Sequence, residues 1–84
     1  MAKAKKDIPK DDFEVFLKKV GNKIRKLRIA KGYSNYEHFA YDHDIARAQY
    51  GKYEQGKDDL RLGSLYKVLK SLDISFEEFF SDDF

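Results

Sequence analysis

The sequence predicts an all-α fold, and three observations support this class. Apolar residues recur with three- and four-residue spacing in several separate segments, as in helices that bury one face. Asn, Ser or Asp precedes most of these segments and Gly follows two of them, and these residue types favour helix starts and ends. No segment alternates apolar and polar residues over a useful length, so we expect no strand. Five helices are predicted in the 84-residue chain.

Length and composition exclude several classes of protein. A chain of 84 residues suffices for one small domain and leaves no room for a separate ligand-binding or catalytic domain. The absence of Cys excludes a disulfide framework and a thiolate metal cluster. No early apolar run resembles a signal peptide or a membrane span. We therefore expect a cytoplasmic protein without membrane association.

The charged residues are unevenly distributed along the chain, although its net charge is only +2. Residues 1–31 contain eleven Lys and Arg against four acidic residues, whereas residues 32–84 contain six against eleven. The front of the chain therefore carries a surplus of about +7. A basic front on an acidic body can meet a polyanion, although a solubilising tail and a solvated helix face produce the same pattern. Charge supports nucleic-acid binding without establishing it.

Residues 1–11 are predicted to form a flexible basic arm ahead of a single domain, residues 12–84. The arm has little apolar content, so it cannot bury enough surface to become ordered. Pro9, the only proline, keeps the preceding residue out of the helical region, and Asp11 or Asp12 is a suitable helix N-cap beyond it. The lysines of the arm are Lys3, Lys5, Lys6 and Lys10.

The first helix is predicted from Phe13 to about Ala30, where Gly32 ends it. Its side chains keep the three- and four-residue spacing throughout this range. Gly21 lies inside the pattern and weakens the helix by about 1 kcal/mol relative to Ala, so a break near it is compatible with the sequence. The predicted buried residues are Phe13, Phe16, Leu17, Val20, Ile24 and Leu27.

Residues 34–56 predict two short helices joined by a tight break. Ser34 or Asn35 can cap the first of them, and Ser34 and Glu37 have the spacing of a capping box. Asp44 ends this helix. Its predicted buried residues are Phe39 and Ala40, with Tyr36 or His43 partly covered.

The second helix of the pair is predicted from about Ala46 to Gln55, after Ile45 fills the corner between the two. Gly56 closes it. One face is predicted to join the core and combines Ala46, Tyr50 and Tyr53. The opposite face has no core to join and combines Arg47, Ala48, Gly51, Lys52 and Gln55. A pair of this kind is suited to presenting side chains to the major groove of DNA.

Two further helices are predicted towards the C-terminus. The first runs from Leu62 to Leu72, with Lys67 and Lys70 on its solvated side. Its predicted buried residues are Leu62, Leu65, Val68, Leu69 and Leu72. Ser75 caps the last helix, and Glu78 stands three residues further on, as in a capping box. This helix has a strongly aromatic side made of Phe76, Phe79 and Phe80.

Four motifs follow one another between residues 21 and 80. They are IRKLR at 24–28, a small Ala40 inside the second helix, Tyr-Glu-x-Gly at 53–56, and LDISFEEFF at 72–80. In this order and spacing they resemble the Cro/CI-type helix-turn-helix family, often called XRE-like, of bacterial and phage regulators. The resemblance implies a compact five-helix, lambda-repressor-like domain that binds double-stranded DNA. It also implies a sequence-specific transcriptional regulator, acting as a repressor on a near-palindromic operator, without catalysis or cofactor.

The resemblance assigns roles to individual residues of the helix pair. In this family the second Arg of the first helix pairs with the Glu at the end of the recognition helix, here Arg28 with Glu54. The first turns of the recognition helix read base edges, so the implied reading residues are Ala46, Arg47, Ala48, Gly51 and Lys52. Arg47 is the preferred candidate among them, because a guanidinium can donate two hydrogen bonds to guanine.

The resemblance also implies a set of contacts with the DNA backbone. The implied phosphate-binding residues are Asn35, Tyr36, Gln49, Lys57 and Arg61. Tyr36 stands where the family usually has Gln, and its hydroxyl can donate to a phosphate, or its ring can be a half-buried aromatic. Regulators of this type also include proteins whose N-terminal arm wraps the duplex. Such an arm raises affinity and salt sensitivity without adding sequence information.

A metal site or an active site is a weaker interpretation of the polar residues. His38 and Asp42 stand four residues apart, with His43 and Asp44 beside them, and this spacing can hold a metal only if a third ligand faces it. No HExxH motif, Gly-rich phosphate loop or nucleophile elbow accompanies them. We interpret the cluster as structural or solvated, and we expect no metal and no enzymatic activity.

A protein-interaction module is the stronger alternative. The aromatic residues near the C-terminus exceed what a minimal five-helix core needs: Phe76, Phe79, Phe80 and Phe84. Exposed rings there predict a homodimer contact or a protein partner, as in an antitoxin-like or adaptor module. If the rings fill the core instead, the protein is a monomer. A homodimer would place two recognition helices about one DNA turn apart, on the order of 34 Å.

Overall fold

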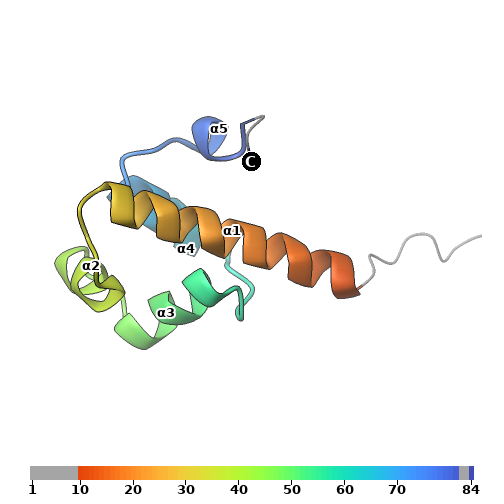
Figure 1. Ribbon diagram of the computed structural model, residues 1–84, viewed down its shortest axis with the longest axis horizontal. Helices are drawn as coiled ribbons and strands as arrows, with labels where there is room; N and C mark the ends of the chain where they lie inside the picture. The colour runs from red at the N-terminus through yellow and green to blue at the C-terminus, as the bar shows by residue number, and fades with distance from the viewer. Residues whose placement is uncertain (1–9, 82–83) are drawn as a thin grey trace, which may run out of the picture.

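The computed structural model describes residues 10–81 and 84, and in this range it contains five helices and no strand (Figure 1). The all-α prediction is therefore confirmed. The helices are α1 (Lys10–Ala30), α2 (Tyr36–Asp42), α3 (Arg47–Gln55), α4 (Leu62–Ser71) and α5 (Phe76–Phe79). Helix α1 runs the length of the molecule, with α2 and α3 on one side of it and α5 on the other.

Helix α1 begins earlier than the sequence predicts. It starts at Lys10, so Asp11 and Asp12 lie inside the helix and neither is its N-cap. Most of the predicted arm lies outside the described residues, apart from its last two positions. The first turns of α1 extend beyond the other helices (Figure 1), and Phe13 and Phe16, which were predicted to be buried, are 39% and 42% exposed.

Gly21 does not break α1, which is continuous through it. The absence of a side chain is instead needed for packing. A Cβ atom at Gly21 would lie 2.5 Å from the carbonyl oxygen of Tyr53 and 2.6 Å from that of Glu54. No real Cβ contact is this short, so only glycine lets α1 approach the last turn of α3 this closely.

The two short helices are capped much as predicted. The side chain of Asn35 accepts hydrogen bonds from the backbone N–H of Glu37 at 2.7 Å and of His38 at 3.3 Å. The capping box predicted from Ser34 is therefore wrong, because Asn35 is the residue that caps α2. At the other end of the pair, Gly56 closes α3 in the left-handed conformation with φ of 69°.

The C-terminal elements contain one confirmed cap and one wrong assignment. Ser75 and Glu78 form the predicted capping box at the start of α5. Leu62, predicted to be buried, is 75% exposed, because it is the first residue of α4 and precedes the turn that packs on the core. The predicted burial of Leu65, Val68, Leu69 and Leu72 is confirmed.

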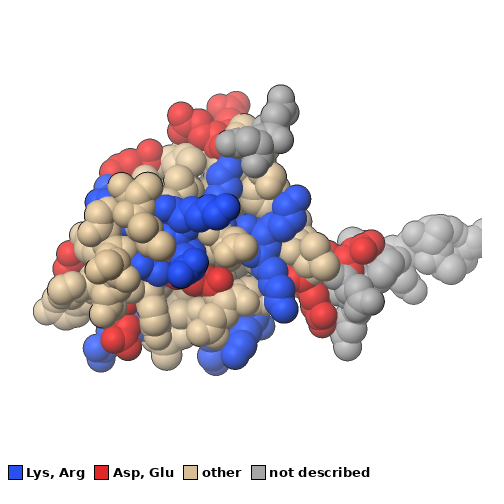
Figure 2. All heavy atoms as spheres, in the orientation of Figure 1, with Lys and Arg blue, Asp and Glu red and all other residues tan. Residues whose placement is uncertain are grey.

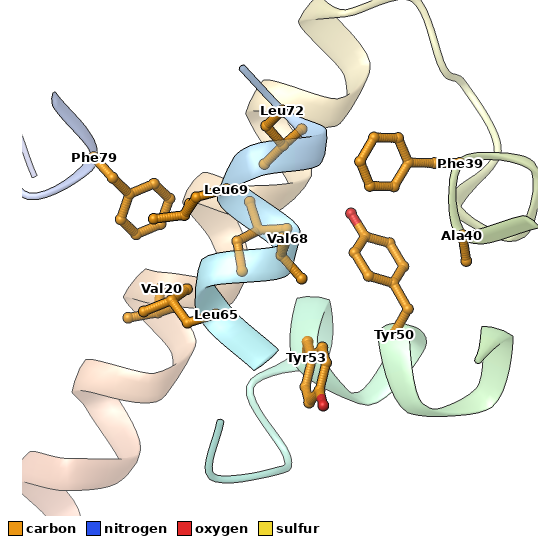
Figure 3. Close-up of a cluster of buried hydrophobic side chains, with 11 residues drawn as sticks. Val20, Phe39, Ala40, Tyr50, Tyr53, Leu65, Val68, Leu69, Leu72 and Phe79 are labelled. Carbon is orange, nitrogen blue, oxygen red and sulfur yellow. The ribbon is translucent and has the colours of Figure 1, made fainter. Parts of the chain in front are cut away.

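The core lies between α1, α3 and α4, and α2 and α5 close its two ends (Figure 3). Its largest fully buried side chains are Tyr50, Phe39, Phe79, Ile24, Leu69 and Val68. Phe39 and Tyr50 lie against each other with ring centroids 5.2 Å apart, which joins α2 to α3. The core thus fixes α3 from beneath and leaves its other face exposed.

Candidate nucleic-acid interface

The outward face of α3 is exposed where the sequence predicts base reading. Arg47, Ala48 and Lys52 are exposed, and Tyr50 and Tyr53 are buried beneath them. Ala46 is also exposed and serves as the N-cap of α3, so its predicted place in the core is wrong. Because Tyr50 and Tyr53 anchor the helix, its polar side chains are presented on a fixed support.

Helix α3 is locked to α1 by the predicted ion pair. Arg28 Nε donates to Glu54 Oε2 at 2.9 Å, and Arg28 Nη2 donates to Glu54 Oε1 at 2.8 Å. The two side chains are only 5% and 7% exposed. This bidentate bond raises the pKa of Arg28 above its usual value, so the guanidinium is always charged.

The same guanidinium holds the loop before α2. Arg28 Nη1 donates to the carbonyl oxygen of Tyr33 at 2.8 Å. The Tyr50 hydroxyl is buried near this pair, and desolvation together with the Glu54 carboxylate raises its pKa far above the usual value. A neutral tyrosine, a carboxylate and a guanidinium thus meet at the junction of α1 and α3. This junction sets the angle at which α3 is presented.

Gly51 is the one predicted reading residue that is buried. The ring of Tyr36, at the start of α2, covers it. A Cβ atom at Gly51 would lie 2.9 Å from Tyr36 Cε1 and 3.1 Å from Tyr36 Cζ. Tyr36 is half-buried and also packs on Tyr50, with ring centroids 6.3 Å apart. The prediction that Gly51 lies on the open face of α3 is therefore wrong, because a helical wheel does not show that a ring of the neighbouring helix covers this position.

The residues predicted to bind phosphates surround the two ends of the helix pair. Lys57 and Arg61 are exposed on the segment between α3 and α4. Gln49 Nε2 donates to Asp58 Oδ2 at 2.5 Å, so this side chain holds the same segment. Asn35 uses its side-chain oxygen to cap α2, which leaves its amide group able to donate. Their contacts with DNA remain predictions.

Comparison with known proteins places this geometry in a family. A family model described as helix-turn-helix matches residues 24–79, from the middle of α1 to the end of α5. The chain belongs to the Cro/CI-type helix-turn-helix family. Members are DNA-binding transcriptional regulators, and the residues matched contain the Arg28–Glu54 pair and the exposed face of α3.

Two related proteins extend the comparison. The control protein C.MunI of a Mycoplasma species is 40% identical over 62 residues, which cover 74% of this chain and 84% of that protein. The crystal structure of the restriction-modification controller protein C.AhdI from Aeromonas hydrophila matches with a TM-score of 0.72 at 33% identity. That match covers 82% of this chain and 99% of C.AhdI. The likeness therefore spans almost the whole of the related structure.

The aromatic residues of this helix-turn-helix protein form a surface that differs from the predicted one. Phe79 is fully buried, so its predicted place on a partner surface is wrong, and Phe76 and Phe84 are partly buried. Phe80 is 38% exposed. It stacks on Phe16 with an interplanar angle of 10° and on Phe76 with one of 21°.

Tyr66 extends this stack, because its ring lies 6.4 Å from that of Phe76 at an interplanar angle of 15°. We call the four stacked rings the aromatic row: Phe16, Phe80, Phe76 and Tyr66. Phe16 and Tyr66 are 42% and 55% exposed, and the sequence analysis did not assign either of them to this surface. Their helical positions gave no signal, since only the docking of α5 between α1 and α4 brings them together.

Charged side chains are distributed as the sequence indicates. Figure 2 shows Lys and Arg spread along α1, and acidic residues gathered around α5. Among the described residues, no three His, Asp or Glu side chains are arranged to hold a metal ion. His43 belongs to the packing of α2, with its Nδ1 2.9 Å from the carbonyl oxygen of Phe39. No described helix is long and apolar enough to span a membrane.

Proposed function

We propose that this regulator controls restriction-modification genes by binding an operator site in the cytoplasm, and that it has no catalytic activity or cofactor. One observation carries the proposal: the exposed face of α3, with Arg47 and Lys52, is held at a fixed angle by the buried Arg28–Glu54 pair. The names of C.MunI, a control protein, and of C.AhdI, a restriction-modification controller, support the choice of target genes.

In this proposal α3 enters the major groove and the residues around it bind phosphates. Arg47 donates two hydrogen bonds to guanine O6 and N7, and Lys52 reaches a base or a phosphate one turn further on. Lys57 and Arg61 neutralise phosphates after α3, and the amide of Asn35 donates to a phosphate before α2. Sequence preference then depends on few side chains, while backbone contacts supply most of the affinity.

We further propose that the protein acts as a homodimer through the aromatic row. Its three most exposed rings, Phe16, Phe80 and Tyr66, form an apolar strip over α1, α5 and α4. Such strips on small proteins are used for association, and a two-fold contact makes the same strip serve both copies. A two-fold dimer on DNA requires a near-palindromic operator with half-sites about one turn apart. Occupation of such a site within a promoter blocks transcription, which corresponds to a repressor.

The decisive experiment is selection of bound fragments from a random duplex library. We expect enrichment of a near-palindrome containing a guanine that depends on Arg47. A set of bound fragments without a common sequence would contradict sequence-specific binding. If no common sequence were found and a protein partner were captured through Phe80, the adaptor alternative would replace the present proposal.

A further inference from the structure

The middle of α3 carries no side chain of its own at Gly51, and the end of the Tyr36 ring occupies that place. An ideal Cβ at Gly51 would lie 2.9, 3.1 and 3.2 Å from Cε1, Cζ and the hydroxyl oxygen of Tyr36. These three atoms are the outermost atoms of the tyrosine. The tip of the ring therefore rests on α3, where a reading helix usually presents a residue of its own.

The position of this ring is fixed by the surrounding structure. Tyr36 directly follows the N-cap Asn35, whose side chain binds the backbone of Glu37 and His38. The ring packs on Tyr50 with an interplanar angle of 32°. A half-buried aromatic held from both sides loses little conformational freedom when it meets a ligand, which favours a role in recognition.

The neighbours of Gly51 on α3 place the ring beside the reading residues. Arg47 and Ala48 precede Gly51 by four and three residues, so all three lie on one side of the helix. Arg47 and Ala48 are exposed. The half-buried ring that covers Gly51 therefore lies beside the exposed side chains of Arg47 and Ala48.

We propose that Tyr36 is a specificity-determining residue, whose ring contacts the 5-methyl group of a thymine in the groove entered by α3. The inference rests on the proposed binding mode of α3. An aromatic edge recognises a methyl group by van der Waals contact, whereas a hydroxyl bound to a phosphate carries no sequence information. The ring of Tyr36 lies against the reading helix itself, and this position favours the methyl contact. Helix α2 thus contributes to a preference that α3 alone does not supply.

Replacement of single thymines in the selected operator by deoxyuridine tests the proposal, because it removes only the methyl group. For the unmodified protein we expect binding to weaken roughly three- to fivefold at one thymine per half-site, the amount for one buried methyl. Tyr36→Gln, which carries the residue usual in the family, should lose this discrimination between thymine and uracil. Tyr36→Phe should retain it, because the ring remains.

Two further variants separate the ring contact from general effects on α2. Gly51→Ala places a methyl group 2.9 Å from the ring, so it should displace Tyr36 and reduce the same discrimination. Tyr41→Ala is the matched control, since Tyr41 also lies on α2 but is 76% exposed, and it should leave the discrimination unchanged. Circular dichroism of each variant verifies that the helices are intact.

Two results would overturn the inference. The first is a Tyr36→Gln protein that still discriminates thymine from uracil at the same place. The second is a Tyr36→Phe protein that no longer discriminates thymine from uracil although its ring remains, which would indicate that the hydroxyl and not the ring makes the contact. Both results presuppose a selected operator, so they differ from failure of the proposed function, in which no operator is obtained from the unmodified protein.

Discussion

The side of the molecule formed by α1 and α3 and the side formed by α1, α4 and α5 are held together by different chemistry. On the first side, a bidentate ion pair between Arg28 and Glu54 and the close approach at Gly21 fix one geometry. On the second, stacked rings join the helices, and part of their area remains exposed. Directional contacts suit an element that must be presented at one angle. Uncovered apolar rings suit a surface that a second copy completes.

The strongest test of the first side is removal of one partner of the ion pair. Glu54→Ala leaves the charge of Arg28 buried without a counter-ion, and we expect unfolding free energy to fall by about 3–5 kcal/mol, measured by urea denaturation. The double variant Arg28→Met with Glu54→Leu should recover most of this loss, because it leaves no buried charge. A loss below about 1 kcal/mol in Glu54→Ala would show that the junction behaves like a surface pair.

The corresponding test of the second side compares two adjacent phenylalanines. Phe79 is fully buried, and Phe79→Ala should lower stability by about 3–5 kcal/mol. Phe80→Ala should cost less in folding, because Phe80 is partly exposed, but it should dissociate the proposed homodimer. Sedimentation velocity at several concentrations measures the second effect. If Phe80→Ala sediments like the unmodified protein, the aromatic row is not the contact between copies.

Close packing on the first side can be tested at Gly21. Gly21→Ala forces a methyl group against two backbone carbonyls of α3, and we expect a loss of about 1–3 kcal/mol in denaturation experiments. The matched control is Gly63→Ala in α4, where a Cβ would meet no atom within 4 Å. That change should stabilise the protein by up to about 1 kcal/mol, since alanine is the better helix former. Equal effects at the two sites would exclude a special role for Gly21.

The first side was the easier to predict from sequence, and the reasons are physical. Helix periodicity and capping residues depend on neighbours in the chain, so the order of the helices and most of the core followed from them. The Arg28–Glu54 pair followed from the family resemblance. The position of Gly51 beneath Tyr36 did not, since a helical wheel contains one helix and not the ring that crosses it.

The second side depends on contacts between distant segments, which local patterns do not contain. Phe79 and Phe80 are adjacent in sequence, and only the docking of α5 decides that Phe79 is buried and Phe80 is exposed. The carbonyl oxygen of Phe79 accepts a hydrogen bond of 2.7 Å from Lys23 Nζ of α1, which lies 56 residues away in the sequence. Aromatic composition predicted exposed rings near the C-terminus, but it did not predict which rings are exposed.

The division between reading and holding residues is tested by two substitutions near α3. Arg47→Ala should reduce binding to the selected operator by about 1–3 kcal/mol and relax the preference at one base pair. Lys57→Ala should weaken binding to all sequences alike and reduce the dependence on salt. Titrations of operator variants at two salt concentrations measure both effects. Identical profiles for the two variants would show that Arg47 does not read bases.

The smallest expected effect concerns the exposed ion pair between Lys31, just after α1, and Asp73, in the loop after α4. Lys31 Nζ lies 2.6 Å from Asp73 Oδ2. The ammonium of Lys31 lowers the pKa of Asp73 below its usual value of about 3.9. The ionised carboxylate is therefore favoured in the folded protein. Its contribution to stability is present above about pH 4 and is lost as the pH falls through the lowered pKa of the folded state.

Asp73→Asn should remove this part of the pH dependence while preserving the backbone, because Asp73 has a positive φ of 59° and Asn adopts such angles readily. Thermal unfolding midpoints of the two proteins should differ above pH 4 and converge in more acidic solution. High salt should also reduce the difference, since both charges are accessible to solvent.

The buried Arg28–Glu54 pair should respond much less to salt. The salt dependence of Asp73→Asn and of Glu54→Ala therefore distinguishes the exposed ion pair from the buried one. A difference that persists unchanged into acid would mean that Asp73 acts through its backbone conformation and not through its charge.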